Sequence, residues 1–357
     1  MSPDSREVER QRSTATAAIV GVAGTTLNAE ERVLFRAKRP AGFILFARNC
    51  ADPDQVTGLI KDLRDSIDND DAPVLIDQEG GRVARLKPPH WQKLPALRRI
   101  GNLASQDLGA ASYAAWLHAR LLAADLEPLG ITVNCAPVLD LGFPGQTEAI
   151  GDRSISDDST VVAALGRQVI DGHLAGGVLP VIKHLPGHGR ATVDSHKHLP
   201  CVTAGAPELA EADWLPFREN ADAPFGMTAH ILFKELDASA CATQSAAIIQ
   251  DVIRDRIGFK GVLFSDDLSM EALGGSLGER AARARQAGCD LALHCNGDFD
   301  EMTAVLDAAG PLEGEAANRV DRALARRRPP EAFDVVQGRQ RLEHLLANAA
   351  PPTEAVG

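Results

Sequence analysis

The chain has 357 residues, of which 45% are hydrophobic and 24% are charged, and its formal net charge at pH 7 is -12. This composition is ordinary for a globular protein and is sufficient for one large domain or two small ones. The acidic balance argues against nucleic acid as a partner, and no apolar run is long enough to span a membrane.

The amino terminus and the cysteines indicate the compartment. Residues 1–10 lack the apolar core of a secretory signal. The six cysteines are scattered and form no Cys-x-x-Cys pair, which suits free thiols in a reducing cytoplasm. We therefore expect a cytoplasmic protein in which residues 14–349 form one folded domain with helices at its carboxyl end. The start, 1–13, and the tail, 350–357, are expected to be flexible.

From residue 14 onward the pattern of a short apolar strand, a turn and an amphipathic helix repeats. Asn28 followed by Glu31 predicts a helix start, and that helix should end before Pro40. Asp52 as a cap with Pro53 in the first position predicts the next helix. Strands are predicted over 17–22, 42–46, 73–76, 131–134, 178–182, 225–230, 261–264 and 290–294, with helices near 106–124 and 248–257 among the connections.

Eight strands that alternate with helices favour a closed barrel. No Gly-x-Gly-x-x-Gly follows the first strand, which argues against an open sheet that binds a dinucleotide. The sequence therefore predicts an α/β protein with a single-domain (β/α)8 TIM barrel. In such a barrel the carboxyl ends of all strands meet at one face, and the active site is expected there.

The fifth strand leads into the most reactive stretch of the chain. It delivers Lys183 and His184 and then enters a glycine-containing loop with further histidines and Asp194. Simple turn chemistry is one interpretation. A metal site built from His184, His188, Asp194, His196 and His198 is a second, although the spacing matches no zinc motif. The third is a dyad in which Asp194 orients His196 for proton transfer, and it needs a second catalytic group elsewhere.

The other strand ends carry charged groups as well. They supply Asp77 and Arg85 after the third strand, Asp152 and Arg153 after the fourth, His230 on the sixth and Asp266 on the seventh. Cations and carboxylates around one cavity suit a ligand that is rich in hydroxyl groups, such as a sugar. The alternative is that Asp77, Glu79, Arg82 and Arg85 form a solvated surface network.

Four motifs in this chain resemble those of one enzyme family. They are Lys183-His-Leu-Pro-Gly-His-Gly189 with Asp194-Ser-His196, Gly261-Val-Leu-Phe-Ser-Asp-Asp-Leu-Ser-Met270, Ile76-Asp-Gln-Glu-Gly-Gly-Arg82 and Gly151-Asp-Arg-Ser154. In combination they are similar to those of the glycoside hydrolase family 3 β-N-acetylglucosaminidases (β-hexosaminidases) of bacterial peptidoglycan recycling. The resemblance runs from about residue 16 to about residue 305. The short single-domain form is similar to that of Gram-negative bacteria, in which the enzyme is cytoplasmic.

The resemblance implies a role for each matching position. Asp266 corresponds to the nucleophile, although spacing alone does not choose it over Asp267, and His196 corresponds to the acid/base, with Asp194 orienting it. The chain departs from the family at Leu185, where phenylalanine is usual, and at Arg190, where aspartate is common. The implied sugar-binding residues are Asp77, Arg85, Arg153, Lys183 and His184.

The expected function is therefore a retaining exo-β-N-acetylglucosaminidase. It would remove N-acetylglucosamine from N-acetylglucosaminyl-anhydro-N-acetylmuramyl peptides through a covalent glycosyl-aspartate intermediate. We expect a monomer with a small-molecule sugar substrate, no cofactor, no metal, and no nucleic acid or membrane partner. The alternatives are a phosphorylase of the same fold, a metal-dependent hydrolase and a sugar-binding module without turnover. The loop that bears His196 should act as a lid with Gly187 and Gly189 as hinges.

Overall fold

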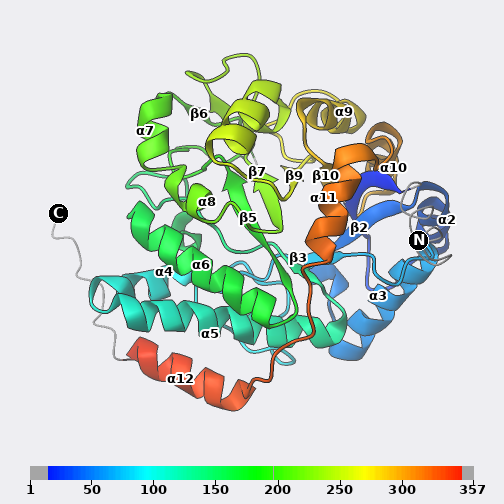
Figure 1. The fold of residues 1–357 in the computed structure, drawn as a ribbon. Helices are drawn as coiled ribbons and strands as arrows, with labels where there is room; N and C mark the ends of the chain where they lie inside the picture. Colours follow the sequence, from blue (N-terminus) through cyan, green and yellow to red (C-terminus); the bar gives the residue numbers. More distant parts are fainter. Residues whose placement is uncertain (1–14, 196, 348–357) are drawn as a thin grey trace.

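Eight parallel strands close into a barrel in this computed structural model, which describes residues 15–195 and 197–347 (Figure 1). Their order around the barrel is β1-β10-β9-β7-β5-β4-β3-β2, and each strand pairs in parallel with both neighbours. The predicted barrel is confirmed. The strands are β1 (Thr16–Gly21), β2 (Pro40–Leu45), β3 (Val74–Ile76), β4 (Val133–Asn134), β5 (Leu179–Leu185), β7 (Phe225–Thr228), β9 (Val262–Asp267) and β10 (Leu291–His294).

Helices surround the barrel. On one side α5 and α6 pack against each other and α12 packs on α5 (Figure 1). Every helix in the described part of the chain is too short or too polar to cross a membrane. The α-helices are α2 (Ala29–Lys38), α3 (Pro53–Ser66), α4 (Leu97–Gly101), α5 (Leu108–Leu126), α6 (Ser159–Ala175), α7 (Ala206–Glu211), α8 (Leu215–Glu219), α9 (Leu277–Ala287), α10 (Phe299–Ala308), α11 (Gly314–Leu324) and α12 (Val335–Ala347).

Local sequence signals set several of these boundaries. The Asn28 side chain accepts a hydrogen bond from the Glu31 N–H, and the Glu31 carboxylate accepts one from the Asn28 N–H, which completes the predicted capping box. Asp52 caps α3 with Pro53 in its first turn, also as predicted. The helix expected over 248–257 is present as a π-helix, Ile248–Arg256. The spacing of its apolar residues does not distinguish an α-helix from a π-helix, so the sequence did not predict this type.

The side chains of the strands alternate between two cores. Residues such as Ile19 and Ile44 point into the barrel, whereas Ala18 and Val20 belong to the core between barrel and helices. The inner core continues into Leu312 and into residues of α11, so this helix closes the amino-terminal end of the barrel. The carboxyl-terminal end of the barrel is instead lined by polar side chains.

Two differences from the expected strands concern the loop that follows β5. This strand continues past residue 182 to Leu185, so Lys183 and His184 lie within it. A small sheet pairs β6 (Cys201–Val202) with β8 (Leu232–Phe233), and the Leu232 N–H donates to the Pro200 carbonyl. The fifteen residues 186–200 are therefore fixed at one end by the barrel and at the other by this sheet. The expected flexible ends, 1–13 and 350–357, lie outside the described residues.

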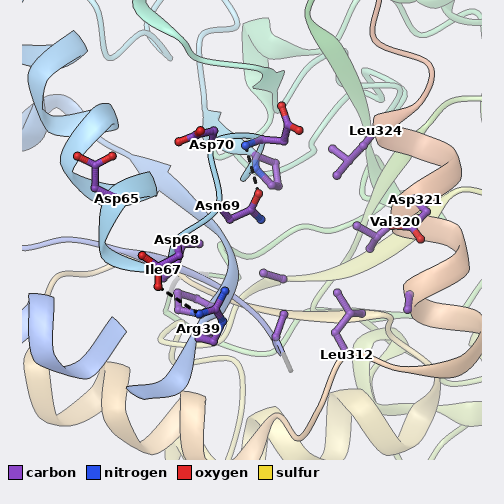
Figure 2. A pocket seen from close by; sticks show the side chains of 16 residues that line it. Arg39, Asp65, Ile67, Asp68, Asn69, Asp70, Leu312, Val320, Asp321 and Leu324 are labelled. Carbon is purple, nitrogen blue, oxygen red and sulfur yellow. Dashed lines mark hydrogen bonds and ion pairs between the residues drawn. The ribbon is translucent and has the colours of Figure 1, made fainter. Parts of the chain in front are cut away.

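A cavity of about 560 Å³ lies at the amino-terminal end of the barrel (Figure 2). Figure 2 shows Arg39 paired with Asp68 on one side and Val320 and Leu324 of α11 across from them. Aspartates form much of its rim and apolar side chains much of its wall. This end of a (β/α)8 barrel ordinarily serves stability, whereas chemistry takes place at the carboxyl ends of the strands.

Candidate active site

A cavity of about 330 Å³ opens at the carboxyl ends of the barrel strands. Apolar side chains such as Phe46, Met227 and Leu293 form part of its wall. His196 lies outside the described residues. The cavity brings together the other predicted site residues, which are Asp77, Arg85, Arg153, Lys183, His184, Asp194 and Asp266.

A buried ion network forms one wall of this cavity. The Lys183 Nζ atom, on β5, lies 2.9 Å from Asp77 Oδ1 and 2.7 Å from Glu79 Oε1, both of which follow β3. Glu79 also accepts two hydrogen bonds from Arg153, each of 2.9 Å. Arg85 Nη2 donates to Asp77 Oδ2 at 3.1 Å. Every charge in this network has an opposite partner, which is the condition under which such groups can be buried.

The pKa values in the network reflect this pairing. Burial alone would lower the pKa of Lys183, but Asp77 and Glu79 raise that pKa above its usual value. Burial would raise the pKa of Glu79, but Arg153 and Lys183 bring it down to about 2. For Asp77, Lys183 and Arg85 outweigh burial and hold the pKa far below its ordinary value. Both carboxylates are therefore ionised at neutral pH.

The alternative of a solvated surface network holds for only one of its four members. The side chains of Glu79, Asp77 and Arg85 are 4%, 14% and 27% exposed, so all three are largely withdrawn from solvent. Arg82, by contrast, is 47% exposed and pairs with the equally exposed Asp152. Arg82 also donates to the carbonyls of residues 148–150, so it ties the loop after β3 to the loop after β4.

The geometry separates the two adjacent aspartates of β9. Asp267 accepts hydrogen bonds from the backbone N–H groups of Ser269 and Cys295 and from the Ser269 hydroxyl. Its carboxylate is thus committed to the turn after β9 and to the backbone just after β10 rather than to a helix cap. Asp266 accepts a hydrogen bond from the Asp267 N–H at 2.8 Å, and both aspartates line the cavity.

Neighbouring groups favour the ionised form of Asp266. Burial would raise its pKa, but His184, His230, the Asp267 N–H and Lys183 together hold that pKa below its ordinary value. His230 is buried, and its Nε2 atom lies 3.0 Å from the Asp267 carbonyl oxygen. An ionised carboxylate in a partly apolar cavity is what a nucleophile requires.

Asp140 links the loop after β4 to β5 and to the loop that follows it. It is buried, and its Oδ2 atom lies 2.6 Å from His184 Nδ1. Its Oδ1 atom accepts a hydrogen bond from the His188 N–H at 2.6 Å. Burial would raise the pKa of Asp140, but His184 and His188 hold it below its ordinary value. Asp140 therefore binds both histidines as a carboxylate.

The first part of the 186–200 loop is packed tightly. A Cβ atom at Gly189 would come within 2.4 Å of the Leu141 carbonyl oxygen, and Gly187 has a φ of 136°, which favours glycine. His188 is buried, burial lowers its pKa to about 4, and its Nε2 atom lies 3.2 Å from Ser195 Oγ. Glycine is therefore required at position 189 by packing and favoured at position 187 by the backbone angle. An alanine at either position would disturb the local structure as well as any hinge motion.

Two residues with evident roles were not among the predicted site residues. Glu79 connects Lys183 to Arg153, and Asp140 connects His184 to His188. Both follow apolar strands, which is the signal that indicated Asp77 and Asp266. The departures at Leu185 and Arg190 do not line the cavity: Leu185 is in the core, and Arg190 pairs with Asp213 and Glu208.

The described residues do not offer a ready metal site. Among residues 15–195 and 197–347, no group of three or more histidine, cysteine, aspartate or glutamate side chains is placed to hold a metal ion. His184, one of the proposed ligands, has its Nδ1 atom engaged by Asp140. Asp140 thus occupies one of the two nitrogens through which that ring could bind a metal.

Comparison with known proteins identifies close relatives. The model of the glycosyl hydrolase family 3 N-terminal domain matches residues 14–327. A Bordetella pertussis protein named beta-hexosaminidase is 34% identical over 331 residues, which cover 91% of this chain and 92% of that protein.

Solved structures agree with this match. The structure of native NagZ from Neisseria gonorrhoeae superposes with a TM-score of 0.82 at 30% identity, covering 95% of this chain and 99% of that one. The complex of the same protein with N-trifluoroacetyl-D-glucosamine has a TM-score of 0.77 at 29% identity, with 95% and 99% coverage. Its complex with zinc ion has a TM-score of 0.81 at 29% identity, with 94% and 99% coverage.

We predict that Glu79→Gln destabilises the protein in a pH-dependent way. Because the pKa of Glu79 is lowered to about 2 in the folded state, the stabilisation it provides is present above its unfolded pKa of about 4.3 and is lost as the pH falls from there toward 2. The variant should lose about 3 kcal/mol in the free energy of unfolding at pH 7. Urea unfolding from pH 7 to pH 3 should show the gap to the wild type narrowing.

The matched control is Asp152→Asn, which breaks the exposed pair with Arg82. Such a pair contributes about 0 to 1 kcal/mol, so this variant should stay close to the wild type at every pH. A gap for Glu79→Gln that stays constant between pH 7 and pH 3 would contradict the pairing described for Glu79.

Proposed function

This chain belongs to glycosyl hydrolase family 3 and is a glycoside hydrolase, and we propose that it acts as a retaining exo-β-N-acetylglucosaminidase. Its substrates would be peptidoglycan fragments of the N-acetylglucosaminyl-anhydro-N-acetylmuramyl peptide type. The observation that carries the proposal is one cavity lined by Asp266, whose pKa is lowered, and by the ion network of Asp77 and Lys183. This arrangement supplies a nucleophile and a binding wall for a sugar.

The binding wall suits a ring of hydroxyl groups. Asp77 can accept hydrogen bonds, Lys183 and Arg85 can donate them, and all three lie within or beside the ion network. Hydrogen bonds to ionised groups are the stronger kind, and the network holds these groups in place before substrate arrives. The Neisseria relative binds N-trifluoroacetyl-D-glucosamine, which supports an N-acylated glucosamine as the sugar.

The proposed reaction has two steps. In the first, a carboxylate oxygen of Asp266 attacks the anomeric carbon and forms a glycosyl ester, while His196 donates a proton to the departing glycosidic oxygen. In the second, His196 takes a proton from water, the water oxygen attacks the anomeric carbon, and the ester bond to Asp266 breaks. The product keeps the β-configuration because each step inverts it.

A histidine suits the acid/base role at neutral pH. Its unperturbed pKa is about 6.5, so it exchanges protons near pH 7 without the desolvation that a glutamic acid needs. Asp194 lines the same cavity, and in the proposal its carboxylate fixes the His196 tautomer and stabilises the imidazolium. The role of His196 rests on the family resemblance, and the lid is expected from the length of the loop that bears it.

We also propose that the protein works in the cytoplasm as a monomer without a metal or other cofactor. None of its six cysteines forms a disulfide, which suits a reducing compartment. The zinc complex of the Neisseria relative makes a zinc requirement the alternative to test.

A phosphorylase is disfavoured by the state of the cations in the cavity. A phosphate dianion needs cations whose positive charge is not already balanced by carboxylates. Lys183 is shared by two carboxylates, Arg153 is engaged in a bidentate pair with Glu79, and Arg85 pairs with Asp77. These contacts neutralise the charges that would hold phosphate, so water is the acceptor we propose.

The function is tested by hydrolysis of a nitrophenyl N-acetyl-β-glucosaminide. We expect turnover that releases free N-acetylglucosamine and is unchanged by prolonged treatment with EDTA or by added phosphate. NMR of the sugar product should show the β-anomer first. Activity that EDTA abolishes and zinc restores would establish the metal-dependent alternative, and release of the sugar 1-phosphate would establish the phosphorylase.

The nucleophile is tested by trapping. A slow 5-fluoro sugar substrate should label Asp266, and Asp266→Ala should reduce turnover by about four orders of magnitude or more without unfolding the protein. Mass spectrometry of the digested protein locates the label. Glu271→Gln, at an exposed position on the same segment, is the control and should be labelled like the wild type. A label on Asp267 or Glu271 would contradict the assignment.

The acid role of His196 predicts a dependence on the leaving group. A natural disaccharide needs a proton on its departing oxygen, whereas nitrophenolate leaves with little help. His196→Ala should therefore reduce kcat/KM for the disaccharide by about 10²- to 10⁴-fold and far less for the nitrophenyl glycoside. The exposed His198 lies on the same loop, and His198→Ala should lose little with either substrate. Equal losses in His196→Ala would pass the role to another group.

A further inference from the structure

Asp140 is a buried carboxylate for which the proposed reaction has no step. It is 1% exposed and lies in the loop after β4, behind His184. The hydrogen bonds recorded for its carboxylate are all to two residues: the ring and backbone N–H of His184 and the backbone N–H of His188. His184 in turn is 5% exposed and lines the cavity together with Asp266. Asp140 thus contacts His184 on the side of the ring that faces away from the cavity.

The charge of Asp140 fixes the direction of its hydrogen bond to the ring. An ionised carboxylate only accepts hydrogen bonds, so the Nδ1 atom of His184, at 2.6 Å, must carry the proton between them. In the neutral ring the other nitrogen, Nε2, then has a lone pair and no proton. The backbone bonds to His184 and His188 occupy the remaining lone pairs and hold the carboxylate in its orientation.

An acceptor at this position complements its neighbours. Lys183 and Arg85 only donate hydrogen bonds, and Lys183 is adjacent to His184 on β5. Each sugar hydroxyl both donates and accepts hydrogen bonds, so a hydroxyl that accepts from a cation needs an acceptor for the hydrogen bond that its own O–H donates. The Nε2 lone pair of His184 meets that need without adding a further negative charge beside Asp77 and Asp266.

We propose that Asp140 is a positioning residue that holds His184 in the Nδ1–H tautomer, so that Nε2 accepts a hydrogen bond from a hydroxyl or N–H group of the substrate. The inference rests on the proposed function for the identity of that substrate, an N-acetylated amino sugar. The state of the histidine itself does not depend on any substrate. The two can therefore be tested separately.

The first test is the tautomer in the full-length protein without substrate. The ring nitrogens of His184 can be observed by ¹⁵N NMR at a pH where the ring is neutral and assigned by their loss in His184→Ala. We expect a protonated Nδ1 and an unprotonated Nε2. In Asp140→Asn the amide can turn its NH₂ group toward Nδ1, which should move the ring proton to Nε2. An Nε2–H tautomer in the wild type would overturn the proposal, whether or not the variant folds.

The second test is a double-mutant cycle on the nitrophenyl substrate. Asp140→Asn should lower kcat/KM by about 10- to 100-fold, by analogy with the loss seen when the hydrogen-bond partner behind a metal-binding histidine is removed. In the His184→Ala background the same change should cost less than about threefold, because Asp140 acts through that ring. Circular dichroism and thermal unfolding check that each variant is folded.

Asp213→Asn is the matched control, since Asp213 is also buried and binds Arg190 on the neighbouring loop. It should leave the His184 tautomer unchanged. Losses for Asp140→Asn that are equal in both backgrounds, or an unchanged tautomer in that variant, would overturn the inference. A wild-type protein that does not hydrolyse the substrate would instead contradict the proposed function, and the NMR result would still decide the tautomer.

Discussion

The pairing of Lys183 with Asp77 and Glu79 is the constraint on which the cavity depends. An ammonium group that is 2% exposed is costly to bury unless carboxylates surround it, and here two of them lie within 2.9 Å. The second carboxylate binds Arg153, so the charge requirement of one lysine on β5 also fixes the loops after β3 and β4. Three strand ends are thereby held in one arrangement before any substrate binds.

The requirement that buried charges be paired also explains why the aspartates at the ends of β9 and β4 have different roles. The Asp267 carboxylate accepts hydrogen bonds from the backbone of Ser269 and Cys295, and the Asp140 carboxylate accepts them from two histidines. The Asp266 carboxylate, by contrast, lines the cavity with one recorded backbone donor. Carboxylates that are similar in sequence thus acquire different uses through their partners. The cavity at the amino-terminal end of the barrel differs from the candidate active site, because its aspartates surround an apolar recess that α11 closes (Figure 2).

Much of this arrangement could be predicted from sequence because its signals are local. Alternating strands and helices, the caps at Asn28 and Asp52, and polar residues at strand ends sufficed for the barrel and for most of the cavity. The pairing of Glu79 with Lys183 and Arg153 was not predictable, because it depends on how strands distant in sequence are staggered around the barrel. Two further features were not predicted for a similar reason: the π-helix Ile248–Arg256 and the extension of β5 to Leu185. Both depend on contacts with parts of the chain that are distant in sequence.

The central claim is that the cavity at the carboxyl ends holds the sugar whose anomeric carbon meets Asp266. A crystal structure of the Asp266→Asn variant with an N-acetyl-β-glucosaminide bound tests this most directly. We expect the sugar hydroxyls to contact Asp77, Lys183 and His184, and the anomeric carbon to lie about 3 to 3.5 Å from the side chain at position 266. A sugar bound in this cavity with its anomeric carbon turned away from position 266, or bound in the cavity at the amino-terminal end, would contradict the account.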